Sequence, residues 1–386
     1  WARYQIRWKG KRNQSIKEIE FPFAYREGQK DLVVSVYRTI LRKKKLFIQA
    51  PTGVGKTMAT VFPAVEAIGE GLGEKLFYLT AKTITRTVAW QAFDTLKEQA
   101  LRMKVIVLTA KEKICFCEET NCNPDACPYA KGHYDRVNDA VYELITTSDE
   151  MSREILEEQA RKWQVCPHVS EWVDAVICDY NYVFDPNAYL RRFFGEGNKG
   201  EYLFLIDEAH NLVERGREMY SAQIYKEDIL KIKKLVKDRD EKLARKLNDC
   251  NKQLLALKRE CDGLQVLDSV SHIYLKLMAL MTEMERYLED CSNEEIRKEV
   301  LELYFAVRMF ANIHEGLDEN YLIYSELEDS GRFKLRLFCV NPANCLQEFL
   351  DKGNSTILFS ATLLPMHYYK KLLSTSKEDY AIYAES

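Results

Sequence analysis

The stretch Leu46–Thr57 reads LFIQAPTGVGKT and passes from an apolar run, through a turn that contains glycine, to the start of a helix. A phosphate-binding loop needs this order, because its backbone N–H groups close around phosphate oxygens at the N-terminus of a helix. Gly53 and Gly55 supply the backbone freedom for that turn. Lys56 is expected to reach the β- and γ-phosphates of a nucleotide, and Thr57 is expected to place its hydroxyl on Mg²⁺.

A second motif strengthens this interpretation, which the loop alone leaves open because Ala50 stands where the strict pattern has glycine. The run YLFLIDEAH (Tyr202–His210) reads as a buried strand that ends in two adjacent carboxylates. Ligands of open α/β sheets bind at the carboxyl ends of the strands. Asp207 is therefore expected to hold Mg²⁺, and Glu208 to activate the water that attacks the γ-phosphate. An acidic pair can also merely cap a helix, but a cap does not explain the loop upstream. The two motifs together predict ATP hydrolysis.

Other short apolar runs, separated by helical stretches, predict that this site belongs to an α/β domain with a largely parallel sheet. They are Lys75–Thr80, Lys104–Thr109, Asp174–Tyr180 and Thr356–Thr362. Residues 1–20 begin with interleaved aromatic and basic side chains, and we expect short strands or a linker there.

Two segments interrupt the α/β pattern, and the longer one, residues 215–335, contains no proline. Its apolar residues recur at steps of 3, 4 or 7 from Ile229 to Cys261, which predicts a stripe along one long helix in a helical bundle. Gly263 is expected to turn the chain into a second helical stretch. The runs Tyr321–Leu327 and Gly331–Val340 then read as a hairpin that returns to the sheet.

The shorter interruption contains a cysteine cluster. The stretch ICFCEETNCNPDACPYA (Ile114–Ala130) holds four cysteines, and Cys166 follows downstream. Four thiolates at irregular spacing suit a [4Fe–4S] cluster, whereas zinc sites usually contain close pairs of the C-x₂-C type, which this chain lacks. Cys115 and Cys117 are separated by one residue and could bind one metal together only in a cramped turn, so Cys117 is left out. The predicted ligands are Cys115, Cys122, Cys127 and Cys166, with zinc as the alternative metal.

The composition agrees with a globular protein. The chain has 386 residues, of which 46% are hydrophobic and 30% charged, and its formal net charge is −3. No apolar run approaches the roughly 20 residues that cross a bilayer, and no signal peptide is evident, so we expect no membrane partner and a cytoplasmic location. The chain has eleven cysteines, and in a large chain without an export signal a tight cysteine cluster indicates metal binding rather than disulfides. The absence of an initial methionine suggests a fragment or a processed product.

At this point the chain resembles a family. The sequences APTGVGKT and DEAH (Asp207–His210) are similar to motifs I and II of superfamily 2 helicases. Three further stretches resemble the Q-type motif, motif Ia and motif III: YREGQKDL (Tyr25–Leu32), YLTAKTITRTVA (Tyr78–Ala89) and LFSATLLP (Leu358–Pro365). The cysteine insertion between motifs Ia and II narrows the resemblance to XPD/DinG-type (Rad3-related) iron–sulfur DNA helicases.

The resemblance implies a RecA-like P-loop motor domain that is interrupted twice. Its parts would be residues 21–110, 171–214 and 336–386, with an iron–sulfur domain at 111–170 and a helical arch domain at 215–335. The family's second motor domain, which normally completes the ATP site, is expected downstream, so the chain would be the N-terminal portion of a longer helicase. The implied substrate is single-stranded DNA, or a duplex with a single-stranded tail, traversed in the 5′→3′ direction.

The resemblance also assigns roles to residues outside the two nucleotide motifs. Arg26 and Gln29 would lie on the adenine side of ATP. Thr80, Lys82 and Arg86 would contact the nucleic acid, although each taken singly is more often a solvated or packing residue. The residues His210, Ser360 and Thr362 would couple the nucleotide state to the nucleic-acid track.

Two other functions remain open from the sequence. One is a non-motor nucleic-acid-binding protein that uses ATP only as a switch and carries a zinc-bound cysteine module. The other is a zinc-bound scaffold with a decayed motor. The intact Lys56, Thr57, Asp207 and Glu208 argue against the second.

Overall fold

The computed structural model describes residues 1–118, 122–166 and 172–384, and they form two compact units. Unit 1 consists of Trp1–Val213 and Ala343–Ser386, and unit 2 consists of Glu214–Pro342. The nucleotide motifs and the cysteine cluster lie in unit 1. Residues 119–121 and 167–171, inside the predicted iron–sulfur domain, lie outside the described residues.

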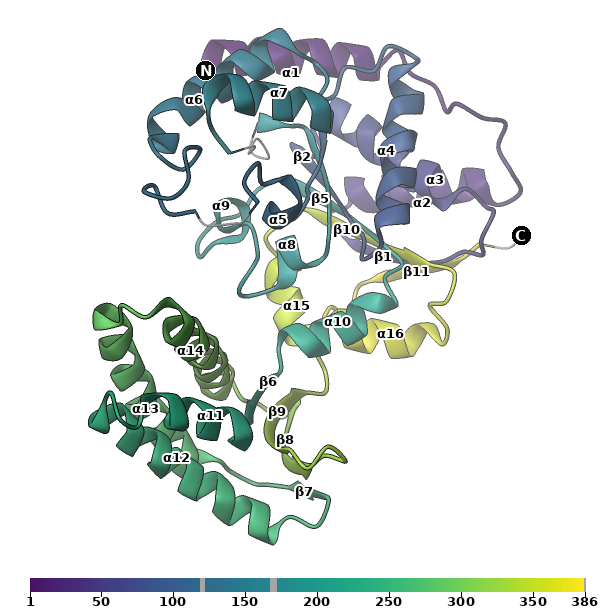
Figure 1. The fold of residues 1–386 in the computed structure, drawn as a ribbon. Helices are drawn as coiled ribbons and strands as arrows, with labels where there is room; N and C mark the ends of the chain where they lie inside the picture. Colours follow the sequence, from purple (N-terminus) through teal and green to yellow (C-terminus); the bar gives the residue numbers. More distant parts are fainter. Residues whose placement is uncertain (119–121, 167–171, 385–386) are drawn as a thin grey trace. The chain divides into compact units, whose positions relative to one another are not determined.

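Unit 1 is built on a parallel sheet, as the apolar runs predict (Figure 1). Its strands are β1 (Lys45–Gln49), β2 (Lys75–Leu79), β3 (Val105–Val107), β4 (Ala175–Cys178), β5 (Tyr202–Asp207), β10 (Ser355–Ser360) and β11 (Tyr380–Tyr383). Their order is β11-β1-β10-β5-β2-β4-β3, and every pairing is parallel. β10 therefore lies between the strand of the phosphate-binding loop and the strand that ends in Asp207.

Helices cover both faces of this sheet, because its strands are apolar on both sides. The helices of unit 1 are α1 (Ala2–Ile16), α2 (Gln29–Leu41), α3 (Lys56–Gly69), α4 (Thr83–Lys97), α5 (Lys111–Ile114), α6 (His133–Thr147), α7 (Arg153–Trp163), α8 (Asn181–Phe184), α9 (Arg191–Phe194), α15 (Ala343–Leu350) and α16 (Met366–Leu373). Helix α10 (Asn211–Met219) spans the boundary between the units. In β2, Leu76 and Tyr78 face the core that α2, α3 and α4 share. Phe77, between them, packs against Phe193 and Phe194 of α9 on the other face.

The expectation of strands in residues 1–20 is wrong, because Ala2–Ile16 form helix α1. The buried residues Trp8, Arg12, Ser15 and Ile16 follow one another at helical steps of 4, 3 and 1, and they face unit 1. The interleaving of aromatic and basic residues resembles the two-residue alternation of a strand, although this stretch is helical. Tertiary contacts, above all with the buried Asp174, select the helix.

Unit 2 contains helices, as predicted, together with a sheet of its own. The helices are α11 (Lys226–Val236), α12 (Glu241–Glu260), α13 (Ser271–Asp290) and α14 (Glu294–Glu315). The strands are β6 (Ala222–Tyr225), β7 (Leu264–Val266), β8 (Tyr321–Leu327) and β9 (Phe333–Cys339), in the antiparallel order β6-β9-β8-β7. The predicted hairpin is therefore present as β8 and β9, but it does not return to the parallel sheet. Leu335 and Leu337 of β9 pack instead into the helical core of unit 2.

The single long helix predicted for Ile229–Cys261 is also wrong, because the chain breaks between α11 and α12. Asp240 stands at this break and caps α12, since its Oδ1 accepts a hydrogen bond from the backbone N–H of Leu243 at 2.8 Å. The apolar stripe nevertheless stays in one core, because both helices pack against the same cluster.

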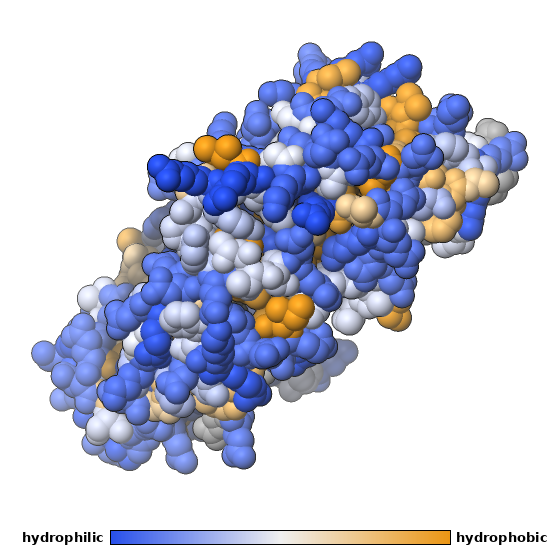
Figure 2. Space-filling model, turned by 90° about the horizontal axis from the view of Figure 1, so that it is seen from above, coloured by the Kyte–Doolittle hydropathy of each residue, from blue (hydrophilic) through white to orange (hydrophobic). Residues whose placement is uncertain are grey.

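On the face that Figure 2 shows, hydrophobic residues form small patches among hydrophilic ones. Within the residues that the structure describes, no helix is long and apolar enough to cross a membrane.

Candidate nucleotide-binding site

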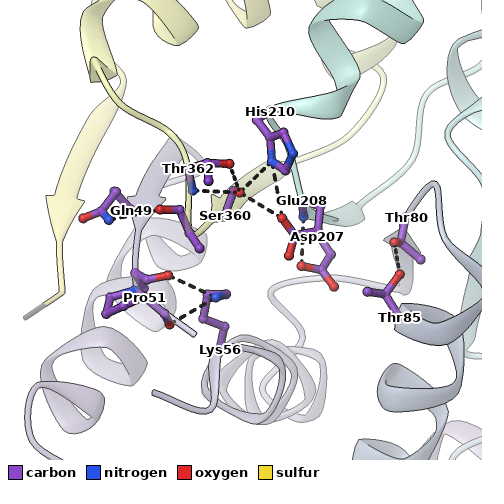
Figure 3. A network of polar contacts seen from close by, with 12 residues as sticks. Gln49, Pro51, Lys56, Thr80, Thr85, Asp207, Glu208, His210, Ser360 and Thr362 are labelled. Carbon is purple, nitrogen blue, oxygen red and sulfur yellow. Dashed lines mark hydrogen bonds and ion pairs between the residues drawn. The ribbon is translucent and has the colours of Figure 1, made fainter. Parts of the chain in front are cut away.

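The loop after β1 has the geometry that a phosphate-binding loop requires. Gly53 and Gly55 have φ angles of 95° and 77°, in the left-handed region that side chains disfavour, and α3 begins directly after Gly55. The Lys56 ammonium donates hydrogen bonds to the carbonyl oxygens of Ala50 at 3.0 Å and Pro51 at 3.1 Å (Figure 3). Lys56 is thus folded over its own loop, and its role toward a phosphate stays a prediction.

Arg26 and Gln29, predicted for the adenine side, brace this loop. The amide Nε2 of Gln29 donates to the carbonyl of Val54 at 2.8 Å, and its Oε1 accepts from the backbone N–H of Arg26 at 3.1 Å. Arg26 in turn donates from Nη1 to the carbonyl of Gly53. Gln29 is buried, whereas Arg26 is exposed. In this conformation the Gln29 amide serves the loop backbone, and its role toward adenine stays a prediction.

Asp207 lies at the carboxyl end of β5 with 5% of its surface exposed. Its Oδ2 accepts a hydrogen bond from the Tyr78 hydroxyl at 2.8 Å, and its Oδ1 accepts one from the backbone N–H of Glu208 at 2.8 Å. Burial raises the pKa of Asp207 to about 6, although the Tyr78 hydrogen bond acts in the opposite direction. Tyr78 is fully buried, and burial together with the Asp207 charge raises the pKa of its phenol well above the usual value.

Glu208 and His210 meet the end of β10 in one polar network (Figure 3). The Ser360 hydroxyl donates to Oε2 of Glu208 at 3.0 Å and lies 2.7 Å from Nδ1 of His210. The backbone N–H of Thr362 donates to Ser360 Oγ at 3.2 Å. Burial lowers the pKa of His210, and the nearby Lys82 charge acts in the same direction. The three residues predicted to couple the nucleotide to the nucleic-acid track are therefore in contact with the predicted catalytic carboxylate or with one another.

The predicted nucleic-acid residues differ in their exposure. Lys82 is exposed at the start of α4, and Arg86 on the same helix is partly exposed and forms an ion pair with Asp179 at 3.0 Å. Thr80 is fully buried, and its hydroxyl bonds to that of Thr85. Thr80 therefore cannot reach a nucleic acid in this conformation, and its contribution is to hold the first turn of α4.

The predicted cysteine ligands do not form a complete metal site. Among the described residues, no group of three or more His, Cys, Asp or Glu side chains is arranged to hold a metal ion. Cys117, which the sequence analysis leaves out, has its Sγ 3.8 Å from Sγ of Cys127. Hydrogen bonding to Cys127, followed by burial and by the charges of Cys127 and Cys115, raises the pKa of the Cys117 thiol to about 11. Cys122 is exposed, and Cys115 and Cys166 are partly exposed. The ligand set stays a prediction.

Sequence reasoning missed two tyrosines of the site. Tyr78 holds the carboxylate of Asp207, and Tyr180 donates from its hydroxyl to the backbone carbonyls of Asp207 and Glu208. Both tyrosines are fully buried. The sequence offers one indication of their role. Each tyrosine lies in or directly after an apolar run, KLFYLT or AVICDY, that ends at the same edge of the sheet as Asp207.

Comparisons with known proteins agree with this geometry. Residues 32–120 match the model of the DEAD/DEAH box helicase family, and residues 84–229 match the DEAD_2 family model. The human protein "Regulator of telomere elongation helicase 1" is 22% identical over 268 residues, which cover 55% of this chain and 22% of that protein. A probable ATP-dependent helicase of Methanocaldococcus jannaschii is 31% identical over 118 residues, 30% of this chain and 17% of that protein. A solved structure titled "Truncated XPD" covers 92% of this chain and 100% of its own at a TM-score of 0.58 and 19% identity, which supports the fold alone.

Proposed function

We propose that the chain is an XPD/DinG-type superfamily 2 helicase and forms the ATP-binding part of an ATP-dependent DNA helicase, a proposal that its matches to the DEAD/DEAH box and DEAD_2 helicase models and its similarity to helicases support. One observation carries the proposal: Lys56, the Asp207–Glu208 pair and Ser360 meet at the carboxyl edge of one parallel sheet. The chain spans less than a quarter of the length of the curated relatives named above. The activity and substrate of the whole protein are therefore part of the proposal.

Residues on both sides of the loop suit a magnesium–nucleotide complex. The Tyr78 hydroxyl donates to the Asp207 carboxylate, and Thr57 lies in the first turn of α3, directly after Lys56. A carboxylate and a hydroxyl are the hard oxygen ligands that Mg²⁺ prefers, and the ion neutralises phosphate charge when it is bound. Lys56 would exchange its two carbonyl acceptors for phosphate oxygens.

Glu208 is the proposed general base. Its side chain is partly exposed next to Asp207, and Ser360 and His210 hold one of its oxygens. The other carboxylate oxygen can accept a proton from water that attacks the γ-phosphate. Positioning of this water, rather than covalent chemistry, is what phosphoryl transfer requires of the protein.

The proposed substrate is single-stranded DNA, or a duplex with a single-stranded tail, along which the protein moves in the 5′→3′ direction. Lys82 and Arg86 at the start of α4 would contact the phosphates of the bound strand. A second motor domain would close over the nucleotide and supply arginines, as the family resemblance implies.

The proposed cysteine module binds a [4Fe–4S] cluster through Cys115, Cys122, Cys127 and Cys166. Support comes from the cysteine spacing and from the position of the insertion between motifs Ia and II. The described cysteines do not fit together as a preformed four-thiolate site, and no chemical step is assigned to the cluster.

The decisive experiment measures ATP hydrolysis with and without an oligo(dT) strand in the native full-length polypeptide. We expect DNA-stimulated hydrolysis and DNA unwinding. Lys56→Ala should abolish both, because the loop then has no positively charged side chain to bind the phosphates. ATP turnover that survives Lys56→Ala contradicts the assignment of the site.

The same preparation separates a motor from a switch. A protein that uses ATP only as a switch binds ATP and DNA, but DNA does not stimulate its turnover and no unwinding occurs. Metal analysis of anaerobically purified protein gives the second criterion, since about four irons per chain support the proposed module and stoichiometric zinc contradicts it.

A further inference from the structure

The turn that follows β4 contacts both functional surfaces of unit 1. Asp179 and Tyr180 are consecutive residues in this turn, between the end of β4 and the start of α8. β4 is separated from β5 by β2 in the sheet, so the Tyr180 side chain reaches across one strand to the DEAH segment. The cysteine segment precedes the turn in the chain.

On the nucleotide side, Tyr180 holds the backbone of the proposed general base. Its hydroxyl donates to the carbonyl of Asp207 and lies 3.1 Å from the carbonyl of Glu208. Glu208 has a φ angle of 49°, in the left-handed region, which costs energy for a residue with a Cβ. Such a conformation persists only where neighbouring groups hold it, and the Tyr180 hydroxyl is one of those groups.

On the opposite side, Asp179 holds Arg86 of α4. Asp179 Oδ2 accepts from Nη2 of Arg86 at 3.0 Å, with 16% and 19% of the two side chains exposed. Within the part of the chain that the structure describes, the buried Nε of Arg86 has no hydrogen-bond partner. One donor of the guanidinium is therefore unused, and an acceptor can reach it once the side chain moves.

A cavity of about 590 Å³ opens beside this ion pair. Its lining includes Arg86, Asp179, Trp90 and Tyr182, together with the basic residues Lys113 and Arg153. Three cations and one anion among these side chains favour a negatively charged occupant, and the aromatic rings offer surfaces for a base.

We propose that the Asp179–Tyr180 turn couples nucleic-acid binding to ATP hydrolysis. A backbone phosphate of the bound strand competes with Asp179 for Arg86. Release of Asp179 lets the turn shift, and Tyr180 transmits that shift to the backbone of Glu208, which then moves into its active position. Tyr180 is thus a positioning residue, and the Arg86–Asp179 ion pair restrains hydrolysis while no strand is bound. This inference rests on the proposed function and specifies how that site is regulated.

The first test is Tyr180→Phe in the native full-length polypeptide. We expect DNA-stimulated kcat to fall about tenfold, as for the loss of one hydrogen bond that matters for the active geometry. The KM for ATP and the affinity for oligo(dT) should stay within about twofold, because Tyr180 touches neither ligand. Tyr202→Phe is the matched control, since Tyr202 is a buried tyrosine at the opposite end of β5. Equal kinetics of the two variants overturn the role of Tyr180.

The second test releases the restraint. Asp179→Asn should raise ATP hydrolysis without DNA and reduce the factor by which oligo(dT) stimulates it. Arg86→Gln removes the same ion pair from α4 and should raise the DNA-free rate in the same way, which guards against misfolding of one variant. In the double variant D179N/Y180F the gain from Asp179→Asn should disappear. Unchanged DNA-free rates in both ion-pair variants, or additive effects in the double variant, overturn the coupling.

The outcome is distinguishable from failure of the proposed function. If the wild-type protein hydrolyses no ATP, or if Lys56→Ala retains turnover, the proposed function fails. If the wild type is active and Lys56→Ala is inactive, the kinetics of the Tyr180 and Asp179 variants test the coupling alone.

Discussion

The imidazole of His210 lies 2.7 Å from the hydroxyl of Ser360, although 150 residues separate them in the sequence (Figure 3). The contact exists because β10 pairs directly with β5, with Phe359 opposite Asp207. The ends of the two strands therefore bring the DEAH segment (Asp207–His210) and the segment Ser360–Thr362 together. Ser360 also donates to Glu208, so one buried hydroxyl connects two functional side chains.

Ser360→Ala should separate nucleotide binding from hydrolysis. The variant leaves a charged oxygen of Glu208 without its hydroxyl donor, and a hydrogen bond to a charged group contributes about 1.5–3 kcal/mol. We expect DNA-stimulated kcat to fall by at least about tenfold while ATP affinity stays constant. Steady-state kinetics and binding of a fluorescent ATP analogue measure the two quantities. Ser355→Ala is the matched control, since Ser355 is a buried serine at the opposite end of β10, away from Glu208, and its loss should leave both quantities nearly unchanged. A large loss of affinity in Ser360→Ala would contradict this division.

Gly55→Ala should abolish ATP binding. Gly55 has a φ angle of 77°, and a Cβ at this position would lie 2.5 Å from Nε2 of Gln29, which braces the loop. Gly71 has a similar φ of 81° with open space around it, so Gly71→Ala imposes the backbone strain without the clash. Isothermal titration with Mg-ATP should detect binding to G71A and none to G55A. Equal binding to both would show that the contact with Gln29 is unimportant.

Asp174→Asn should destabilise unit 1 through helix α1. The Asp174 carboxylate accepts hydrogen bonds from Trp8 Nε1 at 2.9 Å, Arg12 Nη1 at 2.8 Å and the backbone N–H of Lys104 at 2.9 Å. Removing one partner of a buried ion pair costs about 3–5 kcal/mol, and the side chains of Arg12 and Asp174 are only 4% and 7% exposed.

Urea unfolding followed by tryptophan fluorescence measures this effect, because all five tryptophans lie in unit 1. Glu378→Gln is the control, since Glu378 forms an exposed ion pair with Lys44 and its loss should change the unfolding free energy little. A result in which both variants match the wild type refutes the anchoring role of Asp174.

The lowered pKa of His210 predicts a loss of stability on the acid side. Burial keeps the folded imidazole neutral at pH values where an unfolded histidine, with its pKa near 6.5, already binds a proton. The unfolded state therefore binds more protons below pH 6.5, so stability falls as the pH drops through this range until the folded imidazole is protonated as well. His210→Gln should lose less stability than the wild type between pH 7.5 and 5.5, in the same fluorescence-detected urea unfolding. Identical losses would show that His210 does not contribute.

Cysteine variants should identify the metal ligands. We expect anaerobically purified Cys127→Ser to lose its iron, and Cys117→Ser to keep about four irons per chain. The two variants test neighbouring sulfur atoms, which lie 3.8 Å apart, although Cys127 is buried and Cys117 is partly exposed. Loss of iron from Cys117→Ser would make Cys117 a ligand and remove one of the four predicted cysteines from the set.

The parallel sheet could be predicted from the sequence, and so could the meeting of the two nucleotide motifs at one edge of it, because these features depend on local pattern. One apolar run of strand length leads into the loop with Gly53–Lys56, and another ends at Asp207–Glu208. The carboxyl ends of parallel strands meet at one edge of the sheet, so these two motifs come together there. The location of Ser360 at the same edge follows from the motif at the end of β10.

Features that depend on tertiary contacts were not predictable in this way. Helix α1 was mistaken for strands because Asp174, which holds Trp8 and Arg12, lies far away in the sequence. The β8–β9 hairpin was expected in the parallel sheet, because its own residues do not indicate that β9 pairs with β6 instead. Tyr180 was missed because its function depends on reaching across β2, which only the strand order reveals.

The strand order also has a consequence for synthesis on the ribosome. β1 carries the phosphate-binding loop, yet both of its neighbours, β10 and β11, come from the segment after unit 2. Unit 2 is continuous, so its residues are all available before either neighbour of β1 has been translated. The nascent chain must keep β1 unpaired while more than 300 residues are added, because Lys45 pairs with Thr356. The strand that carries the phosphate-binding loop is therefore made early, but it gains its native neighbours in the sheet only after unit 2 has been made.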